Sequence, residues 1–293
     1  MSQLGFMMQQ YASLNGLSSL EGVADTQIPN VRFYRSSTGN PRQPFTYQSG
    51  ILILGQGSKN IYLGETRMSY GNDDFLVVGV PLPLECEAFA DNQRPLLGLS
   101  ISVDQAMLQR MVNKLEYMEH RSTSKLGQGL LGLDSVHMNE TMIDVCLRLV
   151  KALCHPLEAE MMGTLLYEEL IFRALTSEKG HVLFDLAHHE GAYAKVAKAL
   201  NRVHSSYQGL LTVQHLADEA NMSVSAFHQA FRAVTFESPL QYIKKVRLNK
   251  AKELIQIEGK RVSEAALIVG YNSSSQFSRE YKRHFNQTPA QAK

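Results

Sequence analysis

Two stretches of the chain repeat one short pattern of polar, aromatic and basic residues. Each has two serines one residue apart, two aromatic residues four positions apart and a basic residue after the second ring: Ser223, Ser225, Phe227, Phe231 and Arg232 in the first, and Ser273, Ser275, Phe277, Tyr281 and Lys282 in the second. Residues four apart share one face of a helix, so each aromatic pair is predicted to face the core. The polar and basic residues between them then face solvent, where their side chains can bind the base edges and phosphates of a nucleic acid.

The solvent-facing residues fall into two groups by their chemistry. Six are predicted to bind base edges: Ser225, His228, Gln229, Ser275, Ser278 and Arg279. Gln229 can bind adenine through two hydrogen bonds, and Arg279 can bind guanine O6 and N7. Five are predicted to bind phosphates, which gives affinity but little sequence information: Ser223, Arg232, Ser273, Lys282 and Arg283.

A short apolar helix pattern and a tight turn precede each stretch. The apolar residues are Val213, Leu216, Ala217 and Ala220 before the first stretch, and Val262, Ala265, Ala266 and Val269 before the second. Both sets follow the spacing of one helix face. Asn221 and Gly270 lie in the two turns, where they tolerate left-handed backbone, and Ser223 and Ser273 stand at N-cap positions of the helices that follow.

The order of helix, turn and capped helix predicts two helix-turn-helix motifs, at about 212–234 and 262–285. Between them, Ser238 and Pro239 are predicted to start a further helix that continues to Ile257. At ~1.5 Å per residue this helix spans ~27 Å. Because adjacent major-groove faces of DNA recur every ~34 Å, the connecting helix is predicted to hold both motifs at a spacing suited to two successive turns.

The composition indicates a folded protein with two domains. The 293 residues are enough for two separate cores. The formal net charge is only +1, but basic residues exceed acidic ones from Lys195 onwards, and acidic residues exceed basic ones before it. A polyanionic partner is therefore expected for the C-terminal part alone. We predict domains at 1–190 and 191–293, with a linker over 176–191.

Other features of the sequence indicate a cytoplasmic protein. The three cysteines, Cys86, Cys146 and Cys154, show no paired spacing and are interpreted as reduced thiols. No apolar run approaches the ~20 residues of a transmembrane helix. The N-terminus shows no secretory signal pattern. No membrane partner is expected.

The N-terminal part changes from a strand-like pattern to a helical one. Short β-prone runs between Ile28 and Ile101, separated by Gly, Pro, Asn and Asp turns, predict a small antiparallel sandwich or barrel. Helices are predicted over 104–117, 140–153 and 156–175, and they suit packing on each other or on a partner subunit. Residues 1–27 are interpreted as either a short helix or a mobile arm.

The C-terminal part resembles a known family of regulators. Residues 231–243, 246–251 and 269–285 read FRAVTFESPLQYI, VRLNKA and VGYNSSSQFSREYKRHF, and they look like the DNA-binding domain of AraC/XylS-type transcriptional regulators. The resemblance departs from the family at Phe236 and Asn286, where glycine is usual. It implies double-stranded DNA and RNA polymerase as partners, a homodimer, and regulation of transcription, as an activator.

The N-terminal part resembles the cupin-like effector domain of one branch of these regulators. The resemblance lies in residues 74–83 (DFLVVGVPLP) and 94–104 (RPLLGLSISVD). It implies a β-barrel with flanking helices, an α+β fold for the whole chain, and a small-molecule effector of unknown identity. Six residues of the predicted strands are candidates for the pocket wall: Phe33, Arg35, Ile53, Tyr62, Val78 and Leu84.

Two alternatives remain open for the N-terminal domain. It could be a barrel that only dimerises, or a cupin-type enzyme with a DNA-binding appendage. Cupin enzymes bind a metal through histidines and a carboxylate on the barrel strands, and the chain has no histidine before His120. We therefore expect no metal, cofactor or catalytic residue. A redox role for Cys86 is disfavoured because Glu85 and Glu87 oppose thiolate formation.

Overall fold

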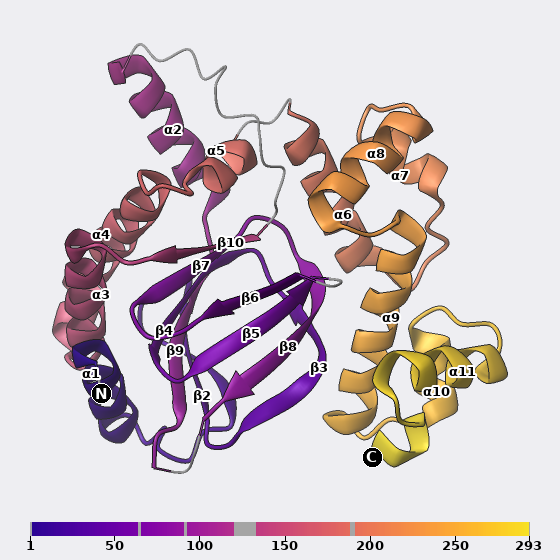
Figure 1. Ribbon diagram of the computed structural model, residues 1–293, viewed down its shortest axis with the longest axis horizontal. Coiled ribbons are helices and arrows are strands. Elements are labelled where there is room, and N and C mark those ends of the chain that lie inside the picture. Colours follow the sequence, from indigo (N-terminus) through magenta and orange to yellow (C-terminus); the bar gives the residue numbers. More distant parts are fainter. Residues whose placement is uncertain (1, 64–65, 91–92, 120–132, 188–190, 293) are drawn as a thin grey trace. The chain divides into compact units, whose positions relative to one another are not determined.

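The computed structural model describes residues 2–63, 66–90, 93–119, 133–187 and 191–292 (Figure 1). These residues fall into two compact units. One unit contains most of the strands and helices α1 to α5. The other contains helix α6 through to the last helix, together with the strand segments Gln43–Tyr47 and Pro81–Glu85. The predicted α+β class is confirmed.

The strands form two sheets. Their bounds are β1 Gly22–Asp25, β2 Val31–Ser36, β3 Gly39–Tyr47, β4 Gly50–Gln56, β5 Ser58–Leu63, β6 Thr66–Tyr70, β7 Asp74–Val78, β8 Leu82–Phe89, β9 Leu96–Ile101 and β10 Leu133–His137. One sheet has the order β1-β2-β9-β4-β7-β10, and the other has the order β3-β8-β5-β6. The two sheets are a sandwich rather than one closed barrel, which is consistent with the predicted cupin-like fold.

The core of the sandwich follows from strand alternation. Phe33 of β2 and Ile53 of β4 both pair with Leu99 of β9 in antiparallel register, and all three side chains are buried. The register of β4 against β9 shifts between Leu54 and Gln56. A bulge of this kind re-aims the residues that follow it, here at the end of β4.

Five helices accompany the sheets in the described part of this unit: α1 Gln3–Leu14, α2 Gln105–Glu119, α3 Glu140–Leu153, α4 Pro156–Leu175 and α5 His181–Ala187. Helix α1 packs on α3 and β4 and buries Leu4, Met8 and Tyr11, so the N-terminal segment is a docked helix. The predicted linker over 176–191 is wrong in part. Helix α5 lies within it, because Val182, Leu183 and neighbouring apolar residues are buried.

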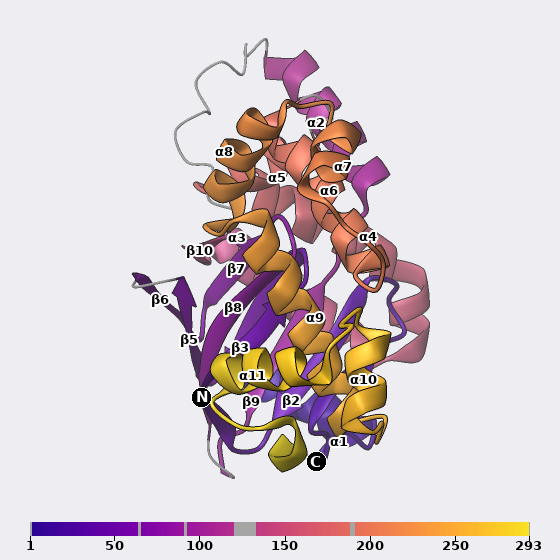
Figure 2. The same cartoon turned by 90° about the vertical axis from the view of Figure 1, so that its right-hand side faces the viewer.

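The second unit is helical. Its elements are α6 Ala192–Ser206, α7 Val213–Glu219, α8 Val224–Thr235, α9 Pro239–Gln256, α10 Val262–Ile268, α11 Ser274–Phe285 and the 3-10 helix η1 Pro289–Ala292. Both predicted helix-turn-helix motifs and the connecting helix are present. Figure 2 shows α9 as a rod with α8 at its beginning and α10 and α11 at its end.

Candidate nucleic-acid interface

Two local features form the first helix-turn-helix motif: a left-handed residue in the turn and a serine that caps the second helix. Asn221 adopts left-handed backbone with φ 50° and ends the turn after α7. The Ser223 hydroxyl then accepts a hydrogen bond from the Ala226 backbone N–H at 3.3 Å and caps α8. Such a cap satisfies one of the free N–H groups of a helix N-terminus.

Aromatic packing sets the rotation of α8. Phe227 and Phe231 are fully buried, and their ring centroids are 5.4 Å apart. Phe231 also meets the ring of Tyr242 on α9 edge to face at 5.4 Å. With these rings inward, the opposite face of α8 is exposed to solvent.

The second motif uses a glycine in its turn. Gly270 has φ +87°, and a Cβ there would lie 2.6 Å from the Gln208 backbone oxygen, so only glycine fits. Arg247 of α9 holds the same segment by donating to the backbone oxygens of Tyr207 and Gly209 at 2.7 and 2.8 Å. These two hydrogen bonds therefore fasten α9 to the loop before α7, and the Gly270 turn lies against that loop.

Helix α11 repeats the arrangement of α8. Ser273 caps it by accepting from the Gln276 backbone N–H at 3.3 Å. Phe277 and Tyr281 are fully buried, with ring centroids 5.5 Å apart. In both helices the buried aromatic pair, spaced by four residues, therefore fixes which face of the helix is exposed.

Glu280 ties α11 to its surroundings. Its carboxylate accepts from the Tyr271 hydroxyl at 2.8 Å and from the Gln276 amide at 3.2 Å, and it pairs with Lys244 of α9 at 3.3 Å. Burial opposes ionisation, but these hydrogen bonds and the Lys244 charge outweigh it, so the pKa of Glu280 is lowered. The sequence reasoning missed Glu280, Tyr271 and Lys244, since no local pattern marks such contacts.

The two departures from the family pattern both lie at helix C-termini. Phe236 ends α8 with φ 62°, and Asn286 ends α11 with φ 56°. Left-handed backbone at this position explains why glycine is usual there. Asparagine adopts it with little strain, whereas phenylalanine does not.

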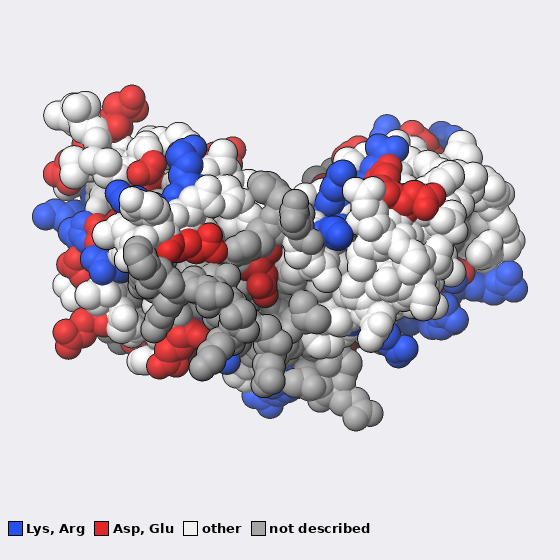
Figure 3. All heavy atoms as spheres, turned by 90° about the horizontal axis from the view of Figure 1, so that it is seen from above, with Lys and Arg blue, Asp and Glu red and all other residues white. Residues whose placement is uncertain are grey.

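The predicted base-binding and phosphate-binding residues lie on the free faces of α8 and α11. All eleven are exposed except Ser278, which is half-buried. Ser223 and Ser273 use a hydroxyl lone pair for capping and keep the hydroxyl hydrogen for a further bond. Figure 3 shows Lys and Arg side chains along the outer edge of the C-terminal unit.

Two histidines of this unit are held neutral. His204 lies 2.8 Å from the Tyr242 hydroxyl, and burial lowers its pKa to about 4. Burial, with the nearby charges of Lys245 and Lys252, lowers the pKa of His284 to about 4. Both side chains serve packing inside the unit rather than charge on its surface.

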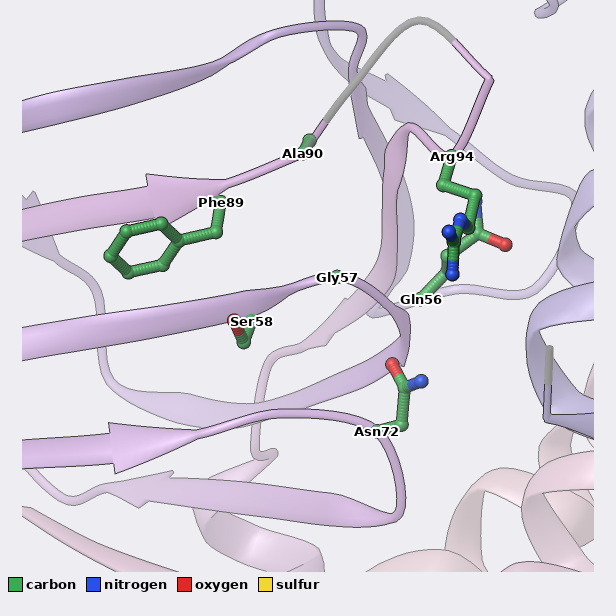
Figure 4. Close-up of a pocket in the computed structure, with 7 residues that line it drawn as sticks. All are labelled: Gln56, Gly57, Ser58, Asn72, Phe89, Ala90 and Arg94. Carbon is green, nitrogen blue, oxygen red and sulfur yellow. The ribbon is translucent and has the colours of Figure 1, made fainter.

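The six residues predicted to line an effector pocket lie on strands of both sheets. Four are buried apolar residues of the sheets: Phe33, Ile53, Val78 and Leu84. Arg35 pairs with Glu21 at 3.1 Å, and the Tyr62 hydroxyl donates to Glu87 at 2.7 Å. Their role in a pocket stays a prediction. A cavity at one end of the sheets is lined by seven other residues (Figure 4).

Comparison with known proteins gives the family. The profile described as "AraC-type transcriptional regulator N-terminus" matches residues 27–182, and a "Helix-turn-helix domain" profile matches residues 216–293. The chain is 34% identical over 97 residues to the HTH-type transcriptional regulator AlkR of Acinetobacter baylyi, which is 33% of this chain and 32% of AlkR. It is 39% identical over 80 residues to the RCS-specific HTH-type transcriptional activator RclR of Escherichia coli K12, covering 27% of this chain and 28% of RclR. The matches therefore span about a third of these relatives.

The fold is similar to that of ToxT from Vibrio cholerae. The structure of ToxT O395 bound to (E)-4-(8-methylnaphthalen-1-yl)but-3-enoic acid matches with a TM-score of 0.59 at 11% identity, over 89% of this chain and 96% of ToxT. The unsaturated fatty acid-bound ToxT of strain SCE256 matches with a TM-score of 0.56 at 12% identity, over 89% and 93% of the two chains. Since the N-terminal profile alone covers more than half of its residues, the chain belongs to the AraC-type transcriptional regulators.

Proposed function

We propose that this chain is a bacterial transcription regulator that binds specific double-stranded DNA through α8 and α11. One observation carries the proposal: two capped helices, aimed by the same buried aromatic spacing, present exposed polar and basic faces in one unit with α9. Two such helices joined by a third suit two successive major-groove contacts.

The two helices take different shares of DNA binding in this proposal. Ser225, His228 and Gln229 read bases from α8, and Ser275, Ser278 and Arg279 read bases from α11. The phosphate contacts come from Ser223, Arg232, Ser273, Lys282 and Arg283. Helix α11 has Lys282 and Arg283 in its last turn, whereas α8 has Arg232 alone. We therefore infer that α11 contributes more of the salt-dependent affinity.

The experiment is to map bound sites across the genome and then measure affinity for one mapped site and for random DNA. Arg279→Ala should weaken binding to the mapped site by ~1–3 kcal/mol and change random-DNA binding much less. Lys198→Ala, at an exposed lysine of α6, is the matched control and should change neither. If Arg279→Ala binds the mapped site and random DNA with the same affinities as the parent, α11 does not recognise bases through Arg279.

The N-terminal domain, residues 1–190, is proposed to control the C-terminal domain, residues 191–293, by binding a small-molecule effector. The resemblance of the fold to ligand-bound ToxT structures supports this role. Membership of the family supports a role as an activator that acts through RNA polymerase. The protein would then act in the cytoplasm, where bacterial DNA is found. The alternative is a sandwich that only dimerises. A thermal-shift screen against metabolites separates the two, since only an effector domain is stabilised by a ligand.

We also propose that the chain forms a homodimer through the exposed apolar stripe of α4. Leu157, Met161 and Leu165 are spaced by four residues and are 76%, 68% and 58% exposed. A second copy of the same helix can cover such a stripe symmetrically. Met161→Glu with Leu165→Glu should give a monomer in sedimentation velocity, and Glu160→Gln on the same helix should leave the dimer intact. A double variant that stays dimeric would exclude this face.

A catalytic role is not part of the proposal. Across the described ranges, no group of three His, Cys, Asp and Glu side chains is placed to hold a metal ion. Among those same residues, no helix has the length and apolar content needed to cross a membrane. Metal analysis of the purified protein tests the alternative of a cupin-type enzyme with a DNA-binding appendage.

A further inference from the structure

Arg247 lies where three segments of the helical unit meet. It is a half-buried residue of α9. Its Nε donates to the Tyr207 backbone oxygen at 2.7 Å, and its Nη2 donates to the Gly209 backbone oxygen at 2.8 Å. Both oxygens belong to the segment that joins α6 to α7. Because a guanidinium is a planar fork with fixed donor directions, the two bonds hold that segment in one orientation against α9.

The same guanidinium lies against the turn of the second helix-turn-helix motif. A Cβ on Gly270 would come 3.2 Å from Nη2 and 3.3 Å from Cζ of Arg247, so the backbone of the turn is in close contact with the guanidinium. That Cβ would also lie 2.6 Å from the Gln208 backbone oxygen. The segment before α7 and the turn before α11 therefore meet at one side chain of the connecting helix.

Tyr207 adds an apolar contact at this junction. It packs against the buried cluster of the second motif, which includes Leu248 of α9, Val269 at the end of α10 and Phe277 of α11. Tyr207 also ends α6, and α6 packs on α7 and α8 of the first motif. The two motifs are therefore connected by a route through α6 as well as through α9.

This second connection restricts how the two motifs can turn relative to each other. Helix α9 has α8 at its beginning and α10 and α11 at its end (Figure 2). Two helices joined only at the ends of a third can pivot about those ends. Arg247 lies near the middle of α9, and its contacts reach both motifs. Hydrogen bonds of this supporting kind hold binding side chains in one geometry.

We propose that Arg247 is a positioning residue that sets the spacing between the bases bound by α8 and the bases bound by α11. Arg247 acts through the relative orientation of the two helices and makes no DNA contact of its own. The separation of two half-sites on DNA follows from the geometry of the protein that binds them. The inference rests on the proposed DNA-binding function and adds to it a determinant of specificity outside the two exposed helix faces.

Binding of the full chain to DNA sites of altered spacing tests this role. In the mapped site, Gln229→Ala identifies the bases bound by α8, and Arg279→Ala identifies those bound by α11. One base pair is then inserted or removed midway between the two groups, which moves one group by ~3.4 Å and rotates it by ~35°. We expect the parent to bind both altered sites about tenfold or more weakly than the mapped site, because one helix loses its base contacts.

Two substitutions of Arg247 should relax this discrimination. Arg247→Met keeps an apolar stem and removes both hydrogen bonds, so each helix can adjust to its own bases, and we expect the loss on altered sites to fall to about threefold. Arg247→Lys keeps the charge without the planar fork and should also discriminate less than the parent. A variant that only unfolds more easily loses affinity for all sites by one factor, so the ratio between sites would stay unchanged.

Arg202→Met is the matched control. Arg202 of α6 pairs with Glu219 of α7 at 3.3 Å, and this contact joins two helices on the side of the first motif. The control should discriminate between the spacings as the parent does. The positioning role is refuted if both Arg247 variants keep the ratio of the parent, or if the parent binds all three spacings equally. If Arg247→Met does not fold, the ratio measured for Arg247→Lys decides.

The same measurements distinguish failure of this inference from failure of the proposed function. A parent chain that has a mapped site, with a spacing preference that survives in the Arg247 variants, refutes the positioning role and leaves the DNA-binding role intact. A parent chain that has no mapped site refutes the DNA-binding role, and the positioning role with it.

Discussion

The Tyr271 hydroxyl donates to the Glu280 carboxylate at 2.8 Å and so joins the turn of the second helix-turn-helix motif to the helix that follows it. The same carboxylate pairs with Lys244 of α9. One side chain thus links the turn, α11 and the connecting helix. Any change at Glu280 should act on how α11 is held, although Glu280 is absent from the faces proposed to bind DNA.

We expect Glu280→Gln to lower the free energy of unfolding by ~1–3 kcal/mol, because it weakens hydrogen bonds to a charged acceptor. The pKa of Glu280 is lowered in the folded chain, so its contribution is present above the ordinary carboxyl pKa and is lost as pH falls through the lower folded value. Urea unfolding at several acidic pH values measures this. Glu264→Gln, at an exposed glutamate of α10, should reproduce neither effect.

Lys282→Ala should weaken DNA binding by a similar factor on all sequences. It should also reduce the slope of log K against log salt by ~1, because one phosphate contact is lost. Titrations of labelled DNA at several salt concentrations give the slope. A loss of affinity confined to the mapped site would instead make Lys282 a base reader.

Phe236→Gly should stabilise the protein. Phe236 has φ 62°, a conformation that costs a side-chain-bearing residue ~1–2 kcal/mol and glycine almost nothing. The ring is 38% exposed, so part of the gain is offset by lost burial, and we expect a net gain of ~0.5–1 kcal/mol by urea unfolding. Leu267→Gly, at a 70% exposed position inside α10, should instead lower the free energy of unfolding by ~1 kcal/mol. If both variants lower the free energy of unfolding equally, the left-handed backbone at Phe236 does not destabilise the parent protein.

Acidification should destabilise the chain through His204 and His284. Both have a folded pKa of about 4, below the ordinary value of 6.5, so the unfolded chain takes up protons first as pH falls. The free energy of unfolding is therefore unaffected by these histidines above about pH 6.5. Between pH 6.5 and pH 4 it falls by at most ~1.4 kcal/mol per pH unit for each histidine. His204→Gln should flatten the pH dependence measured by urea unfolding. A profile identical to that of the parent would show that His204 is protonated without penalty.

Much of the C-terminal unit was predictable from sequence because its signals are local. Ser223 and Ser273 cap the helices that begin beside them, Asn221 and Gly270 make the turns, and the four-residue aromatic spacing sets the exposed faces. Each of these signals acts within about one helical turn of chain. The sequence also predicted a linker over 176–191, where the structure has helix α5. Helix α5 is short, and its apolar residues identify it as a helix only once the fold shows that they are buried.

The tertiary structure decided what depends on residues far apart in the chain. The contact of Glu280 with Lys244, the hold of Arg247 on the loop at Gly209, and the grouping of Gln56, Asn72 and Arg94 around one cavity join segments with no common local pattern. Strand alternation predicts which residues share a face, but a bulge such as that before Gln56 shifts the register and moves side chains to other surroundings. The sequence alone therefore determined which helices present a DNA-binding face. Packing between distant segments decided how those helices are held and which residues line the cavity.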